Sequence, residues 1–106
     1  IPPQTSTIAS HLPKAVGAAF SIPLAKRLKL DGTAMPDDAI VVATFGDASA
    51  NHSTAQGAFN TAGWSAFQGS PLPLVFCCED NGIGISTRTP AGWIAAQFRQ
   101  RAGLHY

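Results

Sequence analysis

Oxygen-bearing side chains follow two apolar stretches of the sequence in the same way. Asp47 comes just after the run AIVVATF at 39–45. The run LVFCC at 74–78 is followed by three polar residues, Glu79, Asp80 and Asn81. Carboxylate and amide oxygens are the ligands that Mg²⁺ and Ca²⁺ prefer. These residues could hold a hard divalent cation if the fold brings them together.

The two apolar runs predict strands of a parallel sheet. Each is nearly continuous, as in parallel strands that are covered on both faces. The residues between them, 53–68, are rich in small side chains and predict a helix, which gives a strand–helix–strand unit. The carboxyl ends of both strands then lie at one edge of the sheet, where ligands bind in open α/β folds. The sequence therefore predicts that Asp47 and residues 79–81 meet at that edge.

The small residues after Asp47 predict close approach of the backbone to an anion. The helix expected to begin near Ser53 would direct its first N–H groups to the same place, which favours phosphate. Mg²⁺ takes one or two protein side chains and completes its octahedron with phosphate oxygens and water. There is no GxxxxGK[ST], and no GxGxxG follows the first strand, so a P-loop and a dinucleotide site are excluded. The combination predicts a Mg²⁺-diphosphate site.

The remaining segments predict helices on either side of this unit. Residues 12–28 have helical apolar spacing, with Ser10 as the N-cap and Pro23 as a kink or an interruption. Residues 79–90 are expected to be loop, and 91–102 are expected to contain a short helix. The fold class predicted is α/β with a parallel sheet.

Composition narrows the class of protein. Of the 106 residues 45% are hydrophobic and only 12% are charged, with a net charge of +1. Because about 25% charged residues is usual for a soluble domain, we expect a piece of something larger or an obligate oligomer. The weak charge argues against nucleic-acid binding, and no apolar run is long enough for a membrane helix.

The N-terminal stretch and the two cysteines bear on where the chain begins and on its cellular compartment. The N-terminal stretch lacks the pattern of a signal peptide, and the absence of an initiator Met indicates that the chain starts within a longer protein. Cys77 and Cys78 are adjacent in a predicted strand and face opposite ways, which indicates reduced thiols rather than a disulfide. We therefore expect a cytoplasmic location.

Several stretches resemble one known family. GDASANH (46–52), followed by EDN (79–81), is similar to the thiamine-diphosphate (ThDP) motif, which begins Gly-Asp-Gly and ends in Asn. Four further stretches resemble the alpha subunit of 2-oxo acid dehydrogenase E1 components, the branched-chain type most closely. They are SHLPKAVGAAFS (10–21), GAFNTAGW (57–64), LVFCCEDNGIGIST (74–87) and GWIAAQFRQRAGLHY (92–106). The resemblance covers nearly the whole chain in the same order.

The resemblance implies a fold, a reaction and partners. Residues 1–106 would be part of a three-layer ThDP-binding domain, with ThDP and Mg²⁺ as cofactors. The reaction implied is oxidative decarboxylation of a branched-chain 2-oxo acid, followed by acyl transfer to lipoamide. The partners implied are an E1 beta subunit, or the beta part of a fused chain, and the lipoyl domain of E2, in an oligomer. Since the beta part supplies the glutamate that activates ThDP in this family, the chain alone would be inactive.

The resemblance also assigns site residues. The Mg²⁺ ligands would be the Asp47 carboxylate, the Asn81 side-chain oxygen and the Ile83 carbonyl. The other cofactor-binding residues would be Ser6 and Ile8 near the aminopyrimidine, and Gly46, Ala48 and Ser49 at the diphosphate. Ala48 stands where the motif has Gly, which narrows the approach to the diphosphate. No catalytic residue is assigned.

Other interpretations of these residues remain open. Asp47 could be a turn residue after a strand, and Asn81 could be a turn former before Gly82; their pairing at this spacing favours the ligand role. For His52 a hydrogen-bonding role is favoured over proton transfer. A transketolase-like ThDP enzyme and a non-catalytic interaction fragment with the ThDP fold are the alternative functions.

Overall fold

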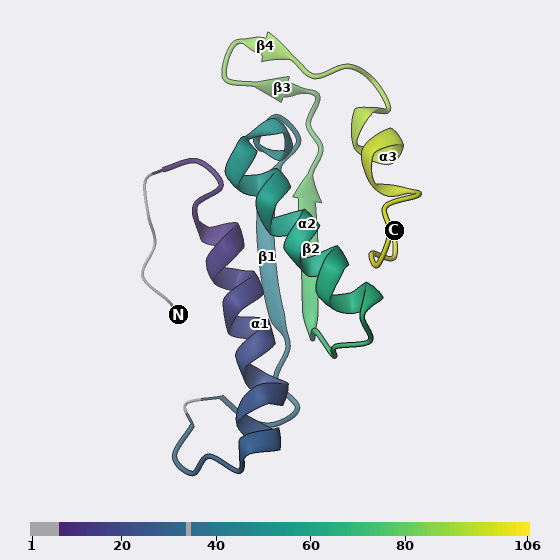
Figure 1. The fold of residues 1–106 in the computed structure, drawn as a ribbon. Coiled ribbons are helices and arrows are strands. Elements are labelled where there is room, and N and C mark those ends of the chain that lie inside the picture. Colours follow the sequence, from purple (N-terminus) through teal and green to yellow (C-terminus); the bar gives the residue numbers. More distant parts are fainter. Residues whose placement is uncertain (1–6, 34) are drawn as a thin grey trace.

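Two parallel strands form the centre of the fold. In the computed structural model, β1 spans Val41–Gly46 and β2 spans Leu74–Glu79. The strands pair in parallel and in register along their whole length. Helix α2, Ser53–Phe67, connects them and lies over one face of the sheet (Figure 1). The predicted strand–helix–strand unit is confirmed. The structure describes residues 7–33 and 35–106.

Helix α1 spans His11–Leu28 and runs beside β1 (Figure 1). Its first residue ties it to the strand, because His11 Nε2 lies 2.7 Å from the carbonyl oxygen of Thr44. That carbonyl can only accept, so the imidazole donates. The interruption expected at Pro23 does not occur, since the helix continues through it. The buried residues of α1 all precede the proline: Leu12, Val16, Ala19 and Ile22. Beyond Pro23 the helix continues to a capped end, where the N–H groups of Lys29 and Leu30 donate to the carbonyl oxygens of Lys26 and Ala25. The one hydrogen bond that proline removes is therefore not enough to end the helix.

Residues 79–90, expected to be loop, contain a short hairpin. Strand β3, Ile83–Gly84, pairs in antiparallel fashion with β4, Thr87–Arg88. The hairpin lies beyond the carboxyl ends of β1 and β2, beside the start of α2 (Figure 1). Helix α3, Trp93–Phe98, follows it and is the short helix that the sequence predicts.

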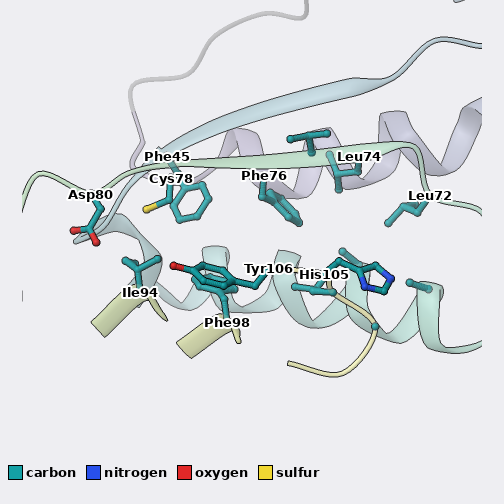
Figure 2. Close-up of a pocket in the computed structure, with 15 residues that line it drawn as sticks. Phe45, Leu72, Leu74, Phe76, Cys78, Asp80, Ile94, Phe98, His105 and Tyr106 are labelled. Atoms are coloured by element: carbon teal, nitrogen blue, oxygen red, sulfur yellow. The ribbon is translucent and has the colours of Figure 1, made fainter. Parts of the chain in front are cut away.

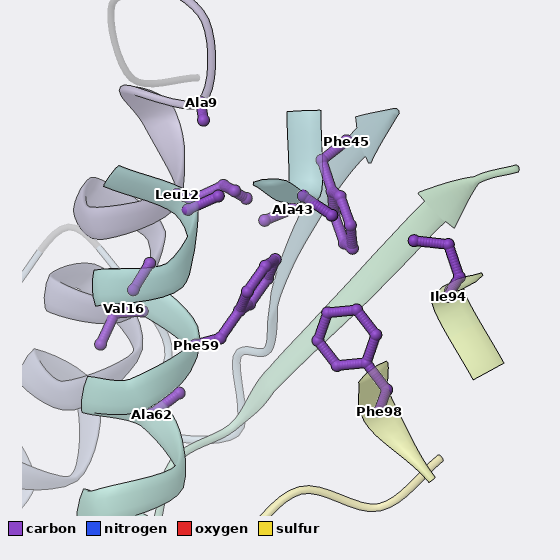
Figure 3. Packing of buried hydrophobic residues seen from close by; sticks show 12 residues of the cluster. Ala9, Leu12, Val16, Ala43, Phe45, Phe59, Ala62, Ile94 and Phe98 are labelled. Atoms are coloured by element: carbon purple, nitrogen blue, oxygen red, sulfur yellow. The ribbon is translucent and has the colours of Figure 1, made fainter. Parts of the chain in front are cut away.

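The core lies between the sheet and the helices and is built around phenylalanine rings. Phe59 of α2 is fully buried. Its ring centroid lies 5.1 Å from that of Phe45 in β1 and 4.9 Å from that of Phe98 in α3 (Figure 3). Leu12 and Val16 of α1 complete the cluster beside α2. One ring therefore holds three elements together, and tilted or edge-on aromatic pairs of this kind add to the stabilisation from burial.

The sheet is covered on one face by the described residues. Ala43 and Phe45 point into the core, whereas Val42 and Val75, opposite each other in the two strands, are 58% and 49% exposed. The α/β fold with a parallel sheet is confirmed. Coverage of both strand faces, expected from the continuous apolar runs, is not found within residues 7–33 and 35–106.

Crossing a lipid bilayer requires a helix of sufficient length and apolar character. No helix in the described part of the chain meets that requirement.

Candidate functional site

A pocket of about 410 Å³ lies at the carboxyl ends of β1 and β2. Its walls include seven of the eight predicted cofactor-binding residues, namely Ile8, Gly46, Asp47, Ala48, Ser49, Asn81 and Ile83. The eighth, Ser6, lies outside the described residues. The walls are completed by residues that the sequence did not single out as ligands: His52, Glu79, Gly84 and Ile85. The fold thus brings the two predicted groups to one place.

Asp47 is a buried carboxylate at the end of β1. Its backbone N–H donates to the carbonyl oxygen of Glu79 across 3.3 Å, which joins the ends of the two strands. The residue is 1% exposed, and its Oδ2 is buried without a hydrogen-bond partner. The one salt bridge among the described residues, Lys26 with Asp37, involves other groups. Because buried charges are normally paired or bound to metals, this oxygen fits a bound cation.

Asn81 and Ile83 approach the same pocket from the β2 side. The Asn81 Oδ1 accepts a hydrogen bond from the Ile83 N–H across 3.0 Å. This short-range contact fixes the side-chain amide, and an amide oxygen keeps a second lone pair for another partner. Within the described residues no group of three or more His, Cys, Asp or Glu side chains could hold a metal. A cation here would have one carboxylate, one amide oxygen and one backbone carbonyl, which suits Mg²⁺ better than Zn²⁺.

Two helical turns follow Asp47. The short 3-10 helix η1, Ser49–Asn51, begins after Ala48, whose φ of −66° and ψ of −37° are ordinary right-handed values. His52 then caps α2, since its Nδ1 accepts a hydrogen bond from the Thr54 N–H at 3.2 Å. The first N–H groups of helical turns lack intrahelical acceptors, so this segment suits an anion. The sequence predicted hydrogen bonding for His52 but missed its capping role.

Residues that follow β4 hold η1 in place through hydrogen bonds, which the sequence did not predict. Arg101 donates to Gln56 Oε1 across 3.0 Å, and Gln56 Nε2 donates to the carbonyl oxygen of Ala50 across 2.6 Å. Trp93 Nε1 donates to Asn51 Oδ1 across 2.8 Å. The loop after Asp47 is therefore held by two residues that are distant in sequence. Trp93 lies 42 positions after its partner Asn51, and Arg101, which acts through Gln56, lies 51 positions after Ala50.

A larger pocket of about 550 Å³ lies between β2, α2 and the C-terminal segment (Figure 2). It contains none of the eight predicted residues and is lined mainly by apolar side chains. Asp80 and Cys78 lie at one end of it (Figure 2). Burial, reinforced by the nearby Asp80 carboxylate, raises the pKa of the Cys78 thiol to about 11. Of residues 79–81, which the sequence predicted to meet Asp47, Asp80 lines this other pocket and not the one that contains Asp47.

Comparisons with known proteins agree with the geometry. Residues 3–105 match the family described as Dehydrogenase E1 component. Over 85 residues, or 80% of this chain, it is 35% identical to "2-oxoisovalerate dehydrogenase subunit alpha 2, mitochondrial" of Arabidopsis thaliana, covering 15% of that protein. The proteins named "2-oxoisovalerate dehydrogenase subunit alpha, mitochondrial" from Mus musculus and Homo sapiens are 34% and 33% identical over the same share of this chain, which covers 16% of each.

These relatives also correct one prediction. The expected cytoplasmic location is wrong, because the relatives are named as mitochondrial proteins. Free thiols are usual in every reducing compartment, so Cys77 and Cys78 do not distinguish the cytoplasm from the mitochondrion. The chain spans about one sixth of the length of these relatives. The resemblance to branched-chain E1 alpha subunits is confirmed, and the chain belongs to the dehydrogenase E1 component family.

Proposed function

We propose that this chain forms the Mg²⁺-diphosphate side of the ThDP site in a 2-oxo acid dehydrogenase E1 component. The activity proposed for the whole enzyme is oxidative decarboxylation of a branched-chain 2-oxo acid and transfer of the acyl group to lipoamide. The substrate class is supported by relatives that are named 2-oxoisovalerate dehydrogenase subunit alpha.

One observation carries the proposal more than any other. Asp47 has a buried oxygen without a hydrogen-bond partner, and the residue lines a pocket together with Asn81 and Ile83. An unsatisfied buried polar atom costs about 1–3 kcal/mol, and more when it is charged. A divalent cation on the Asp47 carboxylate removes that cost, which explains why the sequence keeps a carboxylate there.

The residues would divide the binding between them. Asp47, Asn81 and the Ile83 carbonyl hold Mg²⁺, while the backbone N–H groups of Ala48 and Ser49 contact the diphosphate. Ile8 lines the same pocket and would lie toward the aminopyrimidine. When bound, ThDP supplies the carbon nucleophile and the electron sink that decarboxylation of a 2-oxo acid requires. The task of this chain is to hold the charged end so that the reactive end is fixed in position.

The remaining parts of the proposed site come from partners. The acidic residues of the chain are Asp31, Asp37, Asp38, Asp47, Glu79 and Asp80. They lie between α1 and β1 or at the carboxyl edge of the sheet, so none is placed to activate the aminopyrimidine. We assign that role to an E1 beta subunit or beta part, and acyl acceptance to the lipoyl domain of E2, in an oligomeric enzyme in the mitochondrion.

The test compares Asp47→Asn with Asp38→Asn in the natural protein that carries this chain, assembled with its beta part. Asp47→Asn keeps the shape but removes the charge at the buried position, and Asp38 is an exposed carboxylate. We expect Asp47→Asn to weaken binding of Mg²⁺-ThDP by at least about 100-fold, since even outer-shell changes cost 10–100-fold. The control should bind as the wild type does, and calorimetry at limiting Mg²⁺ measures both.

Equal affinity of Asp47→Asn and the wild type would contradict the metal assignment. Turnover is measured separately, with a 2-oxo acid and an artificial electron acceptor and then with lipoamide. Ketol transfer without acyl transfer to lipoamide would instead indicate a transketolase-like enzyme. An assembled protein that neither binds ThDP nor turns over would indicate a non-catalytic interaction module.

A further inference from the structure

Ala48 and Gly84 lie against each other in the wall of the proposed cofactor site. Ala48 follows Asp47 in the loop after β1, and Gly84 ends β3, directly after Ile83. A Cβ atom added at Gly84 would collide with the Cβ of Ala48. Its next neighbours, the Ala48 Cα at 3.7 Å and the Thr87 carbonyl oxygen at 3.9 Å, would be ordinary contacts. The space between the two loops therefore holds one methyl group, and Ala48 supplies it.

Backbone conformation does not explain the glycine at this position. Gly84 lacks the positive φ that favours glycine, whereas the nearby Gly82 has a φ of +75° and open space around it. Position 82 thus needs glycine because of its left-handed backbone conformation. Position 84 needs glycine because a side chain there would collide with the Ala48 methyl group. Ala48 likewise has an ordinary right-handed conformation, so a glycine there would relieve no backbone strain.

This pairing changes the meaning of Ala48, which stands where the ThDP motif has glycine. The methyl group of Ala48 is accommodated on the opposite side, by the absence of a side chain at Gly84. Gly84 also follows the residue whose carbonyl is the proposed third ligand of Mg²⁺. Any displacement of β3 by a larger residue at 84 would move that carbonyl away from the Asp47 carboxylate.

We propose that Ala48 and Gly84 are a coupled pair of positioning residues that sets the distance between the diphosphate loop and the metal-ligand loop. The expected effect of this pair on cofactor binding rests on the proposed function. One methyl group fills the gap, and it can be placed on either side. Two methyl groups separate the loops, and the metal ligands lose their common centre.

The test is a double-mutant cycle in the natural protein assembled with its beta part. The variants are Gly84→Ala, Ala48→Gly and the double variant, with Gly57→Ala as the control. A Cβ at Gly57 would meet nothing within 4 Å. Calorimetry with Mg²⁺ and ThDP measures affinity, and urea unfolding without cofactor measures stability.

We expect Gly84→Ala to weaken Mg²⁺-ThDP binding by about tenfold or more, within the range of couplings between contacting residues. Ala48→Gly removes a methyl group without creating a clash, so it should weaken binding less than Gly84→Ala does. The double variant should recover to within about threefold of the wild type, a coupling of the sign and size that contact predicts. The Gly57→Ala control should bind as the wild type does.

The proposal is overturned if the double variant binds as weakly as Gly84→Ala, or if Gly84→Ala binds as tightly as the wild type. If Gly84→Ala does not fold, recovery of folded protein by the double variant supports the pair, and failure to recover overturns it. If the wild type itself does not bind ThDP, the proposed function fails. The urea midpoints of the wild type and the three variants then test the coupling between Ala48 and Gly84 without cofactor. If the stability changes of the two single variants add up to that of the double variant, the two residues do not share one space.

Discussion

At the scale of single residues, the adjacent positions Asp47 and Ala48 have different roles in the proposed site. The Asp47 carboxylate is buried with an oxygen that has no partner, and its charge is its contribution. Ala48 would contribute its backbone N–H, and its methyl group lies against Gly84. A turn at the end of a strand needs neither a buried charge nor such a contact, so the turn interpretation of Asp47 explains less of the structure.

Cys78 permits a prediction about pH. Burial raises its thiol pKa from 9.0 to about 11, so the folded protein holds this proton more tightly than the unfolded chain does. The contribution is fully present below about pH 9 and is lost as the pH rises toward 11. We expect the free energy of unfolding to fall more steeply over this interval in the wild type than in Cys78→Ala, measured by urea unfolding.

The control for this pH dependence is Cys77→Ala. Cys77 is the neighbour of Cys78 in β2, but its side chain is on the exposed face. Titration of other groups is common to all three proteins and cancels in the comparison. Identical pH slopes for the wild type and Cys78→Ala would show that the Cys78 thiol is not shielded in the folded protein.

At the scale of elements, the start of α2 determines where the site's N–H groups point. His52 caps this helix through the Thr54 N–H. We expect His52→Ala to lower the free energy of unfolding by about 1 kcal/mol, the usual cost of losing an N-cap. It should also weaken ThDP binding, because His52 itself lines the pocket at the start of α2. Urea unfolding and calorimetry measure the two effects.

A matched variant separates the cap from other roles of the ring. Asn is a strong N-cap residue, so His52→Asn should retain most of the stability and of the ThDP affinity. A stability loss in His52→Asn equal to that in His52→Ala would show that the imidazole acts by packing and not by capping.

At the scale of the whole molecule, large apolar side chains are exposed on two surfaces. Trp64 and Phe67 of α2 are 68% and 77% exposed, and Val42 and Val75 lie on the bare face of the sheet. Exposed apolar surface of this extent marks contacts with other protein. Together with the proposed assignment of the activating group to the beta part, this surface predicts that the 106 residues alone self-associate, bind Mg²⁺-ThDP weakly and do not decarboxylate 2-oxo acids.

Sedimentation velocity and a decarboxylation assay with an artificial electron acceptor test this prediction. The chain alone and the assembled enzyme are measured side by side, so that inactivity of the chain is not a failure of the assay. A monomeric chain would contradict the reading of the apolar surfaces. ThDP-dependent turnover by the chain alone would contradict the assignment of the activating group to the beta part.

The hairpin and Pro23 show where sequence patterns fell short. Strands β3 and β4 have two residues each, too few for a periodic pattern, and Ile85 at their turn has a positive φ of 54° that its residue type disfavours. Pro23 predicts a kink or an interruption of α1, but the helix continues through it to Leu28. In both places the backbone departs from the local preference of the residue type.

The sequence by itself determined the strand–helix–strand unit and the meeting of Asp47 with Asn81. Apolar runs identify buried strands, and a helical crossover makes the strands parallel, so chain connectivity alone places their carboxyl ends at one edge. The tertiary structure decided the rest: the unpartnered oxygen of Asp47, the single methyl space between Ala48 and Gly84, and the fastening of η1 by Arg101 through Gln56. Each depends on atoms from segments far apart in the chain meeting at a few ångströms, which no local pattern encodes.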